Sequence, residues 1–220
     1  MNTFREIASL LALVVAATGV AQADDSSFGI GVKAGTLGIG LEGRWDALPF
    51  MDLRFGANSY ELDADDSYSG IDYEGTLDLE TYYLTANFNF PLSPFRITAG
   101  VFSNGNELNM TSAVADDFTI GGDSYTGAEV GTLTTNTSFE TTAPYLGIGL
   151  DFELFDKAGL NFDLGVLWQD EPLVTLVASG PIADDPNFQA SLAAELEALT
   201  DDLSNFKAYP VISLAFIYNF

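Results

Sequence analysis

The sequence contains no cysteine and no histidine. Without cysteine, no disulfide framework can support the fold. Without histidine, the chain lacks the commonest general base and the commonest transition-metal ligand. A serine nucleophile would therefore have no conventional activator, so we expect neither enzyme activity nor a cofactor.

Basic residues are also scarce. Seven lysines and arginines stand against 32 aspartates and glutamates, which gives a formal net charge of −25. This balance argues against nucleic acid as a partner and against attachment to a lipid surface through basic side chains. Beyond the N-terminal apolar stretch, no segment approaches the roughly 18 uninterrupted apolar residues of a helical membrane span.

The N-terminal stretch has the pattern of a secretory signal. Arg5 supplies a positive charge, residues 7–20 form an apolar run, and Ala21-Gln22-Ala23 is a small-residue cleavage site. The apolar run is too short for a comfortable membrane helix. We therefore predict a signal peptide at 1–23 and one mature domain at 24–220.

The last eleven residues alternate between two kinds of side chain. Every second residue is large and apolar, whereas the residues between are smaller and partly polar; the apolar set is Ile212, Leu214, Phe216, Tyr218 and Phe220. A period of two places the two sets on opposite faces of a strand. A terminal strand with one apolar face and an aromatic end is what a transmembrane β-barrel requires, with one face toward lipid and the other toward the lumen.

Short and long connections alternate along the rest of the chain. Segments with one apolar face flank three short connections, at 46–50, 91–95 and 155–159. The connections between these hairpins are long, polar and acidic, at 62–75, 107–131 and 171–205. Short turns at one end and long loops at the other are typical of an outer-membrane barrel.

The strand count follows from these hairpins. A short first strand through Phe28, Ile30 and Val32 brings the total to eight. The turn near 34–36 could instead be a bulge within one longer strand. The predicted fold is thus all-β, an antiparallel transmembrane β-barrel of eight strands with one amphipathic helix in the last extracellular loop.

The signal peptide, the hairpins and the terminal Tyr218-Asn219-Phe220 together resemble the small, porin-like outer-membrane β-barrel proteins of Gram-negative bacteria. The resemblance implies export through the periplasm and residence in the outer membrane, in contact with its lipid and lipopolysaccharide. It also implies that the barrel-assembly machinery recognises the C-terminal strand. It does not imply one activity, because small barrels serve many functions.

If the apolar parity faces lipid, the opposite parity places a charge cluster in the lumen: Glu42, Arg44, Asp52, Arg54, Arg96, Asp151 and Asp163, accompanied by Lys33, Asn58, Asn87 and Thr98. An eight-stranded barrel is only wide enough to be filled by side chains or to hold something small. The charges can therefore form a salt-bridged plug, or they can line a narrow polar pore. Interior glycines such as Gly56, Gly147, Gly149 and Gly165 leave room and favour the pore.

Two functions remain open at this point. The first is a narrow porin-like channel for small hydrophilic or cationic solutes, lined by the charge cluster. The alternative is a closed-lumen structural or interaction barrel that contributes envelope integrity or surface contacts through its loops. The sequence does not choose between them.

The last long connection contains the one helix that the sequence predicts. Asp185 can cap it, Pro186 suits its first position, and its body extends to about Ser204. An apolar stripe at three- and four-residue spacing comprises Phe188, Leu192, Leu196, Leu199 and Leu203, and extends to Phe206. The stripe can pack against loops or the barrel rim, form a lid over the mouth, or dock a partner.

One acidic segment has a weak resemblance to a calcium-binding loop. Asp63, Asp65, Ser67 and Glu74 occupy positions 1, 3, 5 and 12 of such a loop. The glycine expected at position 6 is Tyr68, and no helices flank the segment. A solvated acidic loop is the better interpretation, and acidic loops at the mouth would attract cations.

Overall fold

The computed structural model describes residues 27–220 except 69–70, 114–116, 140–141, 156 and 204–206. The predicted signal peptide at 1–23 lies outside the described residues. Within the described part of the chain, no helix is both long and apolar enough to cross a membrane.

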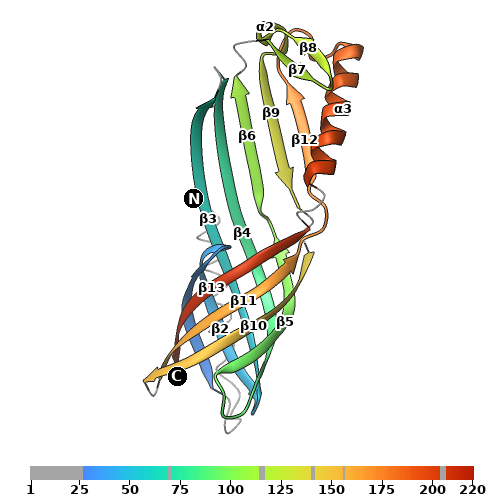
Figure 1. Cartoon of the computed structure of the whole chain (residues 1–220). Coiled ribbons are helices and arrows are strands. Elements are labelled where there is room, and N and C mark those ends of the chain that lie inside the picture. The colour runs from blue at the N-terminus through green and yellow to red at the C-terminus, as the bar shows by residue number, and fades with distance from the viewer. Residues whose placement is uncertain (1–26, 69–70, 114–116, 140–141, 156, 204–206) are drawn as a thin grey trace.

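Eight antiparallel strands close into a barrel, as the sequence predicted (Figure 1). Around the ring, β4 is followed by β3, β2, β1, β13, β11, β10 and β5, and β5 pairs again with β4. The bounds of these strands are β1 (Phe28–Gly35), β2 (Gly38–Leu48), β3 (Met51–Tyr68), β4 (Ile71–Asn89), β5 (Phe95–Asn104), β10 (Thr142–Phe155), β11 (Ala158–Trp168) and β13 (Ala208–Asn219).

The first and last strands seal the ring. Their register runs from Gly29↔Asn219 to Gly35↔Ser213, and the backbone N–H of Phe220 donates to the carbonyl of Phe28 at 2.9 Å. Closure leaves no strand edge within the barrel, as spanning a membrane with strands requires.

β1 and β2 are separate strands, so the bulge alternative is wrong. The turn between them depends on Gly38, whose φ of +97° is a conformation that other residues rarely adopt. This turn interrupts the alternation of the sequence. Leu37 shares its odd parity with the outward-facing Ile39 and Leu41, but the turn buries it inside the mouth of the barrel.

The outer face of the barrel is an apolar belt. On β13, Ile212, Leu214 and Phe216 expose between 43% and 52% of their surface, and the same parity is exposed on the neighbouring strands. So large an exposed apolar surface is unfavourable in water. It is the surface that a lipid-facing barrel presents.

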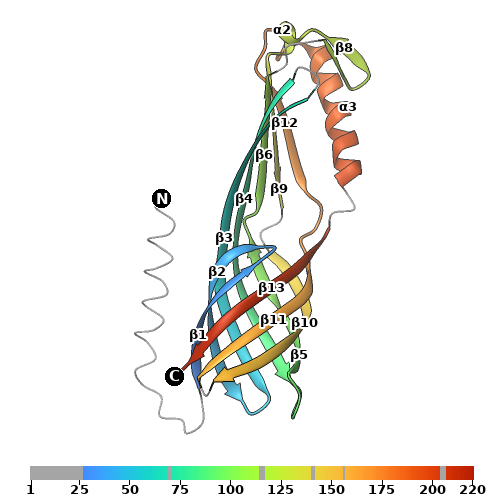
Figure 2. The same ribbon diagram turned by 60° about the vertical axis from the view of Figure 1, so that its left-hand side comes forward.

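The long connections are mostly strands rather than the loops that the sequence predicted. β3 and β4 continue far beyond the barrel, and β6 (Glu107–Ala113), β9 (Thr132–Ser138) and β12 (Leu173–Ala178) extend the sheet from β4 (Figures 1 and 2). We call this projecting part, in the order β3-β4-β6-β9-β12, the upper sheet. Polar residues are frequent in the upper parts of β3 and β4 and in β6 and β9, which is why the sequence indicated loops.

A second core caps one side of the upper sheet. It involves the hairpin β7 (Phe118–Ile120) with β8 (Asp123–Tyr125), α2 (Gly127–Val130) and α3 (Pro186–Leu203). Its buried members are Ile120, Val130, Ala178, Phe188 and Leu192. The predicted helix is thus confirmed, beginning at Pro186.

The first turn of α3 is capped as predicted. Oδ1 of Asp185 accepts hydrogen bonds from the backbone N–H groups of Asn187 and Phe188, at 2.8 and 3.2 Å. These bonds satisfy donors that have no partner within the helix.

Candidate functional site

The barrel interior contains a network of buried ions. Six of the seven residues of the predicted charge cluster belong to it, and Lys33 of β1 joins them. They come from different strands, because strand alternation directs one side chain in two toward the lumen. Arg54 and Arg96, the two arginines of the network, are 2% and 0% exposed.

Arg54 lies at the centre of the network. Its Nε donates to Asp52 Oδ1 at 2.8 Å and its Nη2 donates to Asp151 Oδ2 at 2.8 Å. Nη1 lies 3.5 Å from Glu42 Oε1. One guanidinium thus connects β3 with both β2 and β10 across the lumen. Asp52 is further bound by the amides of Asn87 and Asn89, at 2.8 and 2.7 Å.

Arg96 and Lys33 complete the network on the other side of the lumen. Arg96 forms ion pairs with Asp163 and with Asp151, the latter at 3.4 Å. Lys33 Nζ lies 3.2 Å from Glu42 Oε2 and 3.6 Å from Asp163 Oδ2. Three cations therefore face four carboxylates. Buried charges persist when they are paired in this way.

Arg44 does not belong to the network. Its Nε donates to Asp46 Oδ1 at 2.8 Å, and both side chains are partly exposed near the short turns. The sequence placed Arg44 in the lumen correctly by parity, but its position near the end of β2 puts it in an open vestibule instead of the buried centre.

An aromatic layer lies beside the ions, toward the upper sheet. The rings of Tyr83 and Phe102 are 5.0 Å apart, and those of Phe102 and Tyr145 are 5.2 Å apart. The Tyr83 hydroxyl donates to Glu42 Oε2 at 2.7 Å, which joins this layer to the network. Leu37, Leu167 and Val211 belong to the same buried cluster.

The interior glycines do not leave an open pore, contrary to the sequence-based expectation. A Cβ at Gly56 would lie 2.6 Å from the Tyr83 hydroxyl, and a Cβ at Gly147 would collide with the Tyr145 hydroxyl. Gly149 is likewise covered by the Arg96 guanidinium. The space that these glycines provide is filled by long side chains from the same strand or the neighbouring strand.

The sequence reasoning missed interior aromatic residues, among them Tyr83 and Tyr145. Tyr83 has the inward parity of Asn87 on β4, and Tyr145 has that of Asp151 on β10. Their inward parity could therefore be read from the sequence, whereas the glycines that they cover depend on how the strands are staggered in the closed ring.

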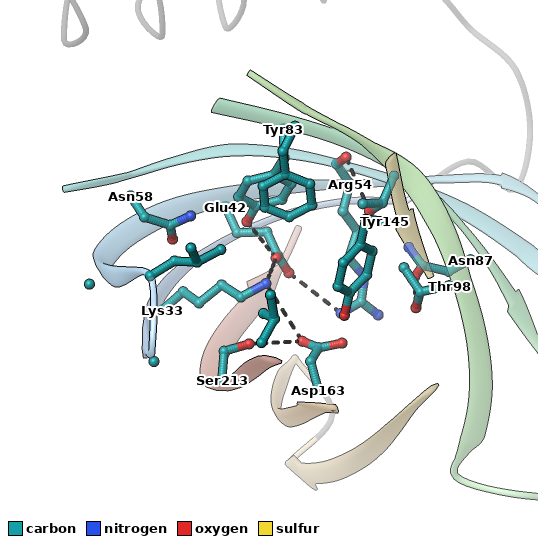
Figure 3. A pocket seen from close by; sticks show the side chains of 16 residues that line it. Lys33, Glu42, Arg54, Asn58, Tyr83, Asn87, Thr98, Tyr145, Asp163 and Ser213 are labelled. Carbon is teal, nitrogen blue, oxygen red and sulfur yellow. Dashed lines mark hydrogen bonds and ion pairs between the residues drawn. The ribbon is translucent and has the colours of Figure 1, made fainter. Parts of the chain in front are cut away.

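Little empty space remains between the ions and the aromatic layer. The cavity there has a volume of about 20 Å³, which is room for about one water molecule. Lys33, Glu42, Tyr83, Tyr145 and Asp163 point toward one another around it (Figure 3).

The end of the barrel that carries the short turns is open. A vestibule of about 1080 Å³ is lined by Arg44 and Asp46 and extends to Asp151 and Asn161. Asp151 is also the partner of both buried arginines. The vestibule therefore meets the ion network directly.

The predicted lid helix lies beside the upper sheet rather than across the barrel mouth (Figures 1 and 2). Phe188 and Leu192 are buried against the sheet, Leu196 and Leu199 are half-buried, and Leu203 ends the helix. Phe206 lies outside the described residues. The apolar stripe is thus used for packing in the upper sheet.

The structure does not support the weak resemblance of residues 63–74 to a calcium-binding loop. Asp63, Asp65 and Ser67 lie on β3 and Glu74 lies on β4, within one long hairpin. An extended strand separates alternate residues by about 7 Å and cannot wrap them around an ion as a compact loop does. Asp63 instead accepts a hydrogen bond from Thr76 Oγ1 at 3.0 Å. No group of three or more metal-ligating side chains is found among the described residues.

Outside the barrel, one exposed ion pair joins the start of the last strand to the segment before β12. Lys207 Nζ donates a hydrogen bond to Glu171 Oε1. This bond lowers the pKa of the Glu171 carboxyl and raises the pKa of the Lys207 ammonium.

Comparison with known proteins identifies the architecture. The chain matches the crystal structure of CarO2 from Acinetobacter baumannii with a TM-score of 0.62 and 22% identity, over 88% of this chain and 98% of that one. It matches CarO from the same organism with a TM-score of 0.58 and 22% identity, over 87% and 97% of the two chains. The chain has the fold of a small outer-membrane β-barrel. No protein-family model and no curated sequence matches it.

Proposed function

We propose that this outer-membrane barrel has a closed lumen and acts as a rigid anchor that displays the upper sheet for surface contacts. The observation that carries the proposal is the filled interior: buried ion pairs and an aromatic layer leave a cavity of only about 20 Å³.

The network opposes opening. Removing one partner of a buried ion pair leaves an uncompensated charge, at a cost of about 3–5 kcal/mol. A solute on the barrel axis would have to displace Arg54 and Arg96, each of which binds two or more carboxylates. Tyr83 and Tyr145 would have to move as well.

The proposed placement of the barrel in the outer membrane follows from its apolar outer surface. The apolar belt would contact outer-membrane lipid and lipopolysaccharide, the short turns would lie in the periplasm, and the upper sheet would project from the cell. β13, which closes the barrel against β1, is the strand that the barrel-assembly machinery would recognise.

One observation favours the channel as a second candidate. The vestibule extends as far as Asp151, whose neighbours in the lumen are the charged side chains of Arg54 and Arg96. A rearrangement of the network would then give a narrow path for small hydrophilic or cationic solutes. In that case the ions would act as a gate.

Liposome swelling separates the two candidates. For the mature chain reconstituted in liposomes, we expect no faster uptake of arabinose, a small neutral sugar, than in protein-free liposomes. The Tyr83→Ala, Tyr145→Ala double variant should swell faster because it removes two of the three rings of the aromatic layer. Tyr82→Ala, whose side chain faces outward next to Tyr83, is the matched control. Rapid swelling with the unaltered protein would reject the closed lumen.

A further inference from the structure

The upper sheet has a free strand edge at β3. Within the barrel, β3 pairs with β2 as far as Ile39↔Ser59. Its pairing with β4 continues to Tyr68↔Ile71. From residue 60 to residue 68, β3 is therefore paired on one side only, and it forms the outer edge of the upper sheet (Figures 1 and 2). Unpaired strand edges are templates for the addition of another strand.

The register shows which backbone groups face this edge. Asn89 N–H donates to the carbonyl of Phe50, and the register then runs without a shift along the whole hairpin. In an antiparallel pair the residues alternate between those bonded to the partner and those pointing away. The even-numbered residues of β3 are thus bonded to β4. Glu61 and Asp63 present their N–H and C=O groups to the free edge.

The two faces of this edge differ in chemistry. Tyr60 and Leu62 are 45% and 47% exposed on the face that continues the barrel interior. Glu61 and Asp63 are exposed on the opposite face. The edge therefore alternates between apolar and acidic side chains along one strand.

Neighbouring strands reinforce the acidic face. Glu61 pairs across the sheet with Asp78, and Asp78 pairs with Glu107. Like charges directly opposite one another destabilise a sheet. The sequences of the upper strands contain no lysine or arginine to offset them. This charge also disfavours edge pairing with a second copy of the chain, which would bring a second acidic row alongside the first.

We propose that the free edge of β3 binds an extended peptide segment in which basic and apolar residues alternate. The segment would add to the sheet as a strand, with backbone hydrogen bonds to Glu61 and Asp63. Its basic side chains would lie opposite the carboxylates, and its apolar side chains opposite Tyr60 and Leu62. The inference rests on the proposed display function and specifies the class of partner.

The test uses the full mature chain in phosphatidylcholine nanodiscs, with empty nanodiscs as the blank. The probe is a fluorescein-labelled nine-residue peptide of alternating lysine and valine. Its control is an isomer in which five lysines precede four valines. We expect the alternating peptide to bind about tenfold more tightly, because only that isomer matches both faces at once. Hydrogen exchange should slow at the edge-facing amides of Glu61 and Asp63.

Variants separate strand addition from general attraction to acidic charge. Asp63→Pro removes an edge-facing N–H without removing a backbone hydrogen bond to β4, and we expect about a fivefold loss of binding or more. Asp63→Asn keeps that N–H and should lose less, and its binding should depend less on salt. Glu107→Gln neutralises the same acidic face two strands from the edge and should change binding by less than about twofold.

Three results would overturn the inference: equal binding of the two isomers, no binding of the alternating peptide, or an equal loss in Glu107→Gln and Asp63→Pro. If Asp63→Pro does not fold, hydrogen exchange in the unaltered chain tests the inference instead. Strand addition then requires slower exchange at the amides of Glu61 and Asp63 when the alternating peptide is bound. Solute flux through the barrel is measured separately. A leaky barrel would reject the closed lumen but would not bear on peptide binding at the free edge of β3. Failed peptide binding would reject only the proposal for that edge.

Discussion

Arg54 joins strands on opposite sides of the lumen through ion pairs with Glu42, Asp52 and Asp151. Each of these carboxylates would be left with fewer partners if the guanidinium were removed, and all but Asp151 are almost fully buried. At the scale of single residues, the closed interior therefore depends on the pairing of buried charges with one another.

We expect Arg54→Met to lower the free energy of unfolding by about 3–5 kcal/mol, because it leaves buried carboxylates unpaired. Arg44→Met is the matched control. It breaks a more exposed pair with Asp46 and should cost about 1 kcal/mol or less. Urea titration in detergent micelles, followed by tryptophan fluorescence, measures both. Equal losses in the two variants would contradict the role of the network.

Gly149→Ala tests the packing of Arg96. The added Cβ would collide with the Arg96 guanidinium. We expect a destabilisation of about 1–3 kcal/mol, typical of overpacking a filled interior. The control is Gly159→Ala, whose Cβ would meet its nearest neighbour, the carbonyl oxygen of Phe152, at 3.2 Å. The same urea titration applies, and a neutral Gly149→Ala would mean that the interior has spare room.

The sequence could predict which side chains point into the barrel. It could not predict how completely those side chains fill the lumen. Alternation alone placed Arg54, Arg96 and Asp163 inside the barrel. It could not show that Tyr83 and Tyr145 lie over glycines of neighbouring strands, because that depends on the stagger between strands in the closed ring. The turn at Gly38 also moved Leu37 from the outer face to the interior.

At the scale of elements, α3 and the upper sheet form a unit with its own core. Phe188 packs against Tyr125 with ring centroids 5.0 Å apart, and Ser191 Oγ donates to Asp123 Oδ2 at 2.9 Å. These contacts join the helix to the hairpin β7–β8. The barrel has a separate apolar cluster around Phe102. The two cores do not share a residue among their buried members.

Phe188→Ala should loosen the upper sheet and leave the barrel intact. Truncating a fully buried phenylalanine costs about 3–5 kcal/mol. We expect faster hydrogen exchange in α3 and β12 and unchanged exchange in β1 and β13. Glu197→Ala, at an exposed position of the same helix, should change neither region. Faster exchange throughout the barrel would mean that the two cores unfold together.

The helix could be predicted from the sequence because its start signal is local. Asp185 and Pro186 stand directly before an apolar stripe of helical period, and the cap forms as expected. The strands of the upper sheet could not be predicted in the same way. Glu61-Leu62-Asp63 alternates as a strand does, but its charge density indicated a solvated loop. Pairing with β4 is the tertiary contact that decides the outcome.

At the scale of the whole molecule, the chain is a filled barrel that continues into a projecting sheet. The sequence predicted that the strands close into a ring, how many strands there are, and which face of each strand points outward. All three follow from the two-residue period and the short turns. It did not predict the upper sheet, whose strands β6, β9 and β12 assemble on an extension of β4. Closure of the lumen lies inside the barrel and does not depend on α3.

Deleting residues 186–203 should therefore leave the barrel closed. If the helix were a lid, its removal would raise single-channel conductance. If Arg54, Tyr83 and Tyr145 close the lumen, the deletion variant should show no channel current. The same deletion should speed hydrogen exchange in β12, which loses its packing against α3. Conductance that appears only after the deletion would restore the lid interpretation.

The most direct test of the closed lumen is the ionic conductance of the unaltered mature chain in planar bilayers. We predict no discrete current steps at any voltage that the bilayer withstands, because the ion network and the aromatic layer block the barrel axis. The Tyr83→Ala, Tyr145→Ala variant should produce steps under the same conditions. Reproducible steps from the unaltered chain, abolished or altered by Arg54→Met, would contradict the closed lumen and establish the interior charges as the lining of a pore.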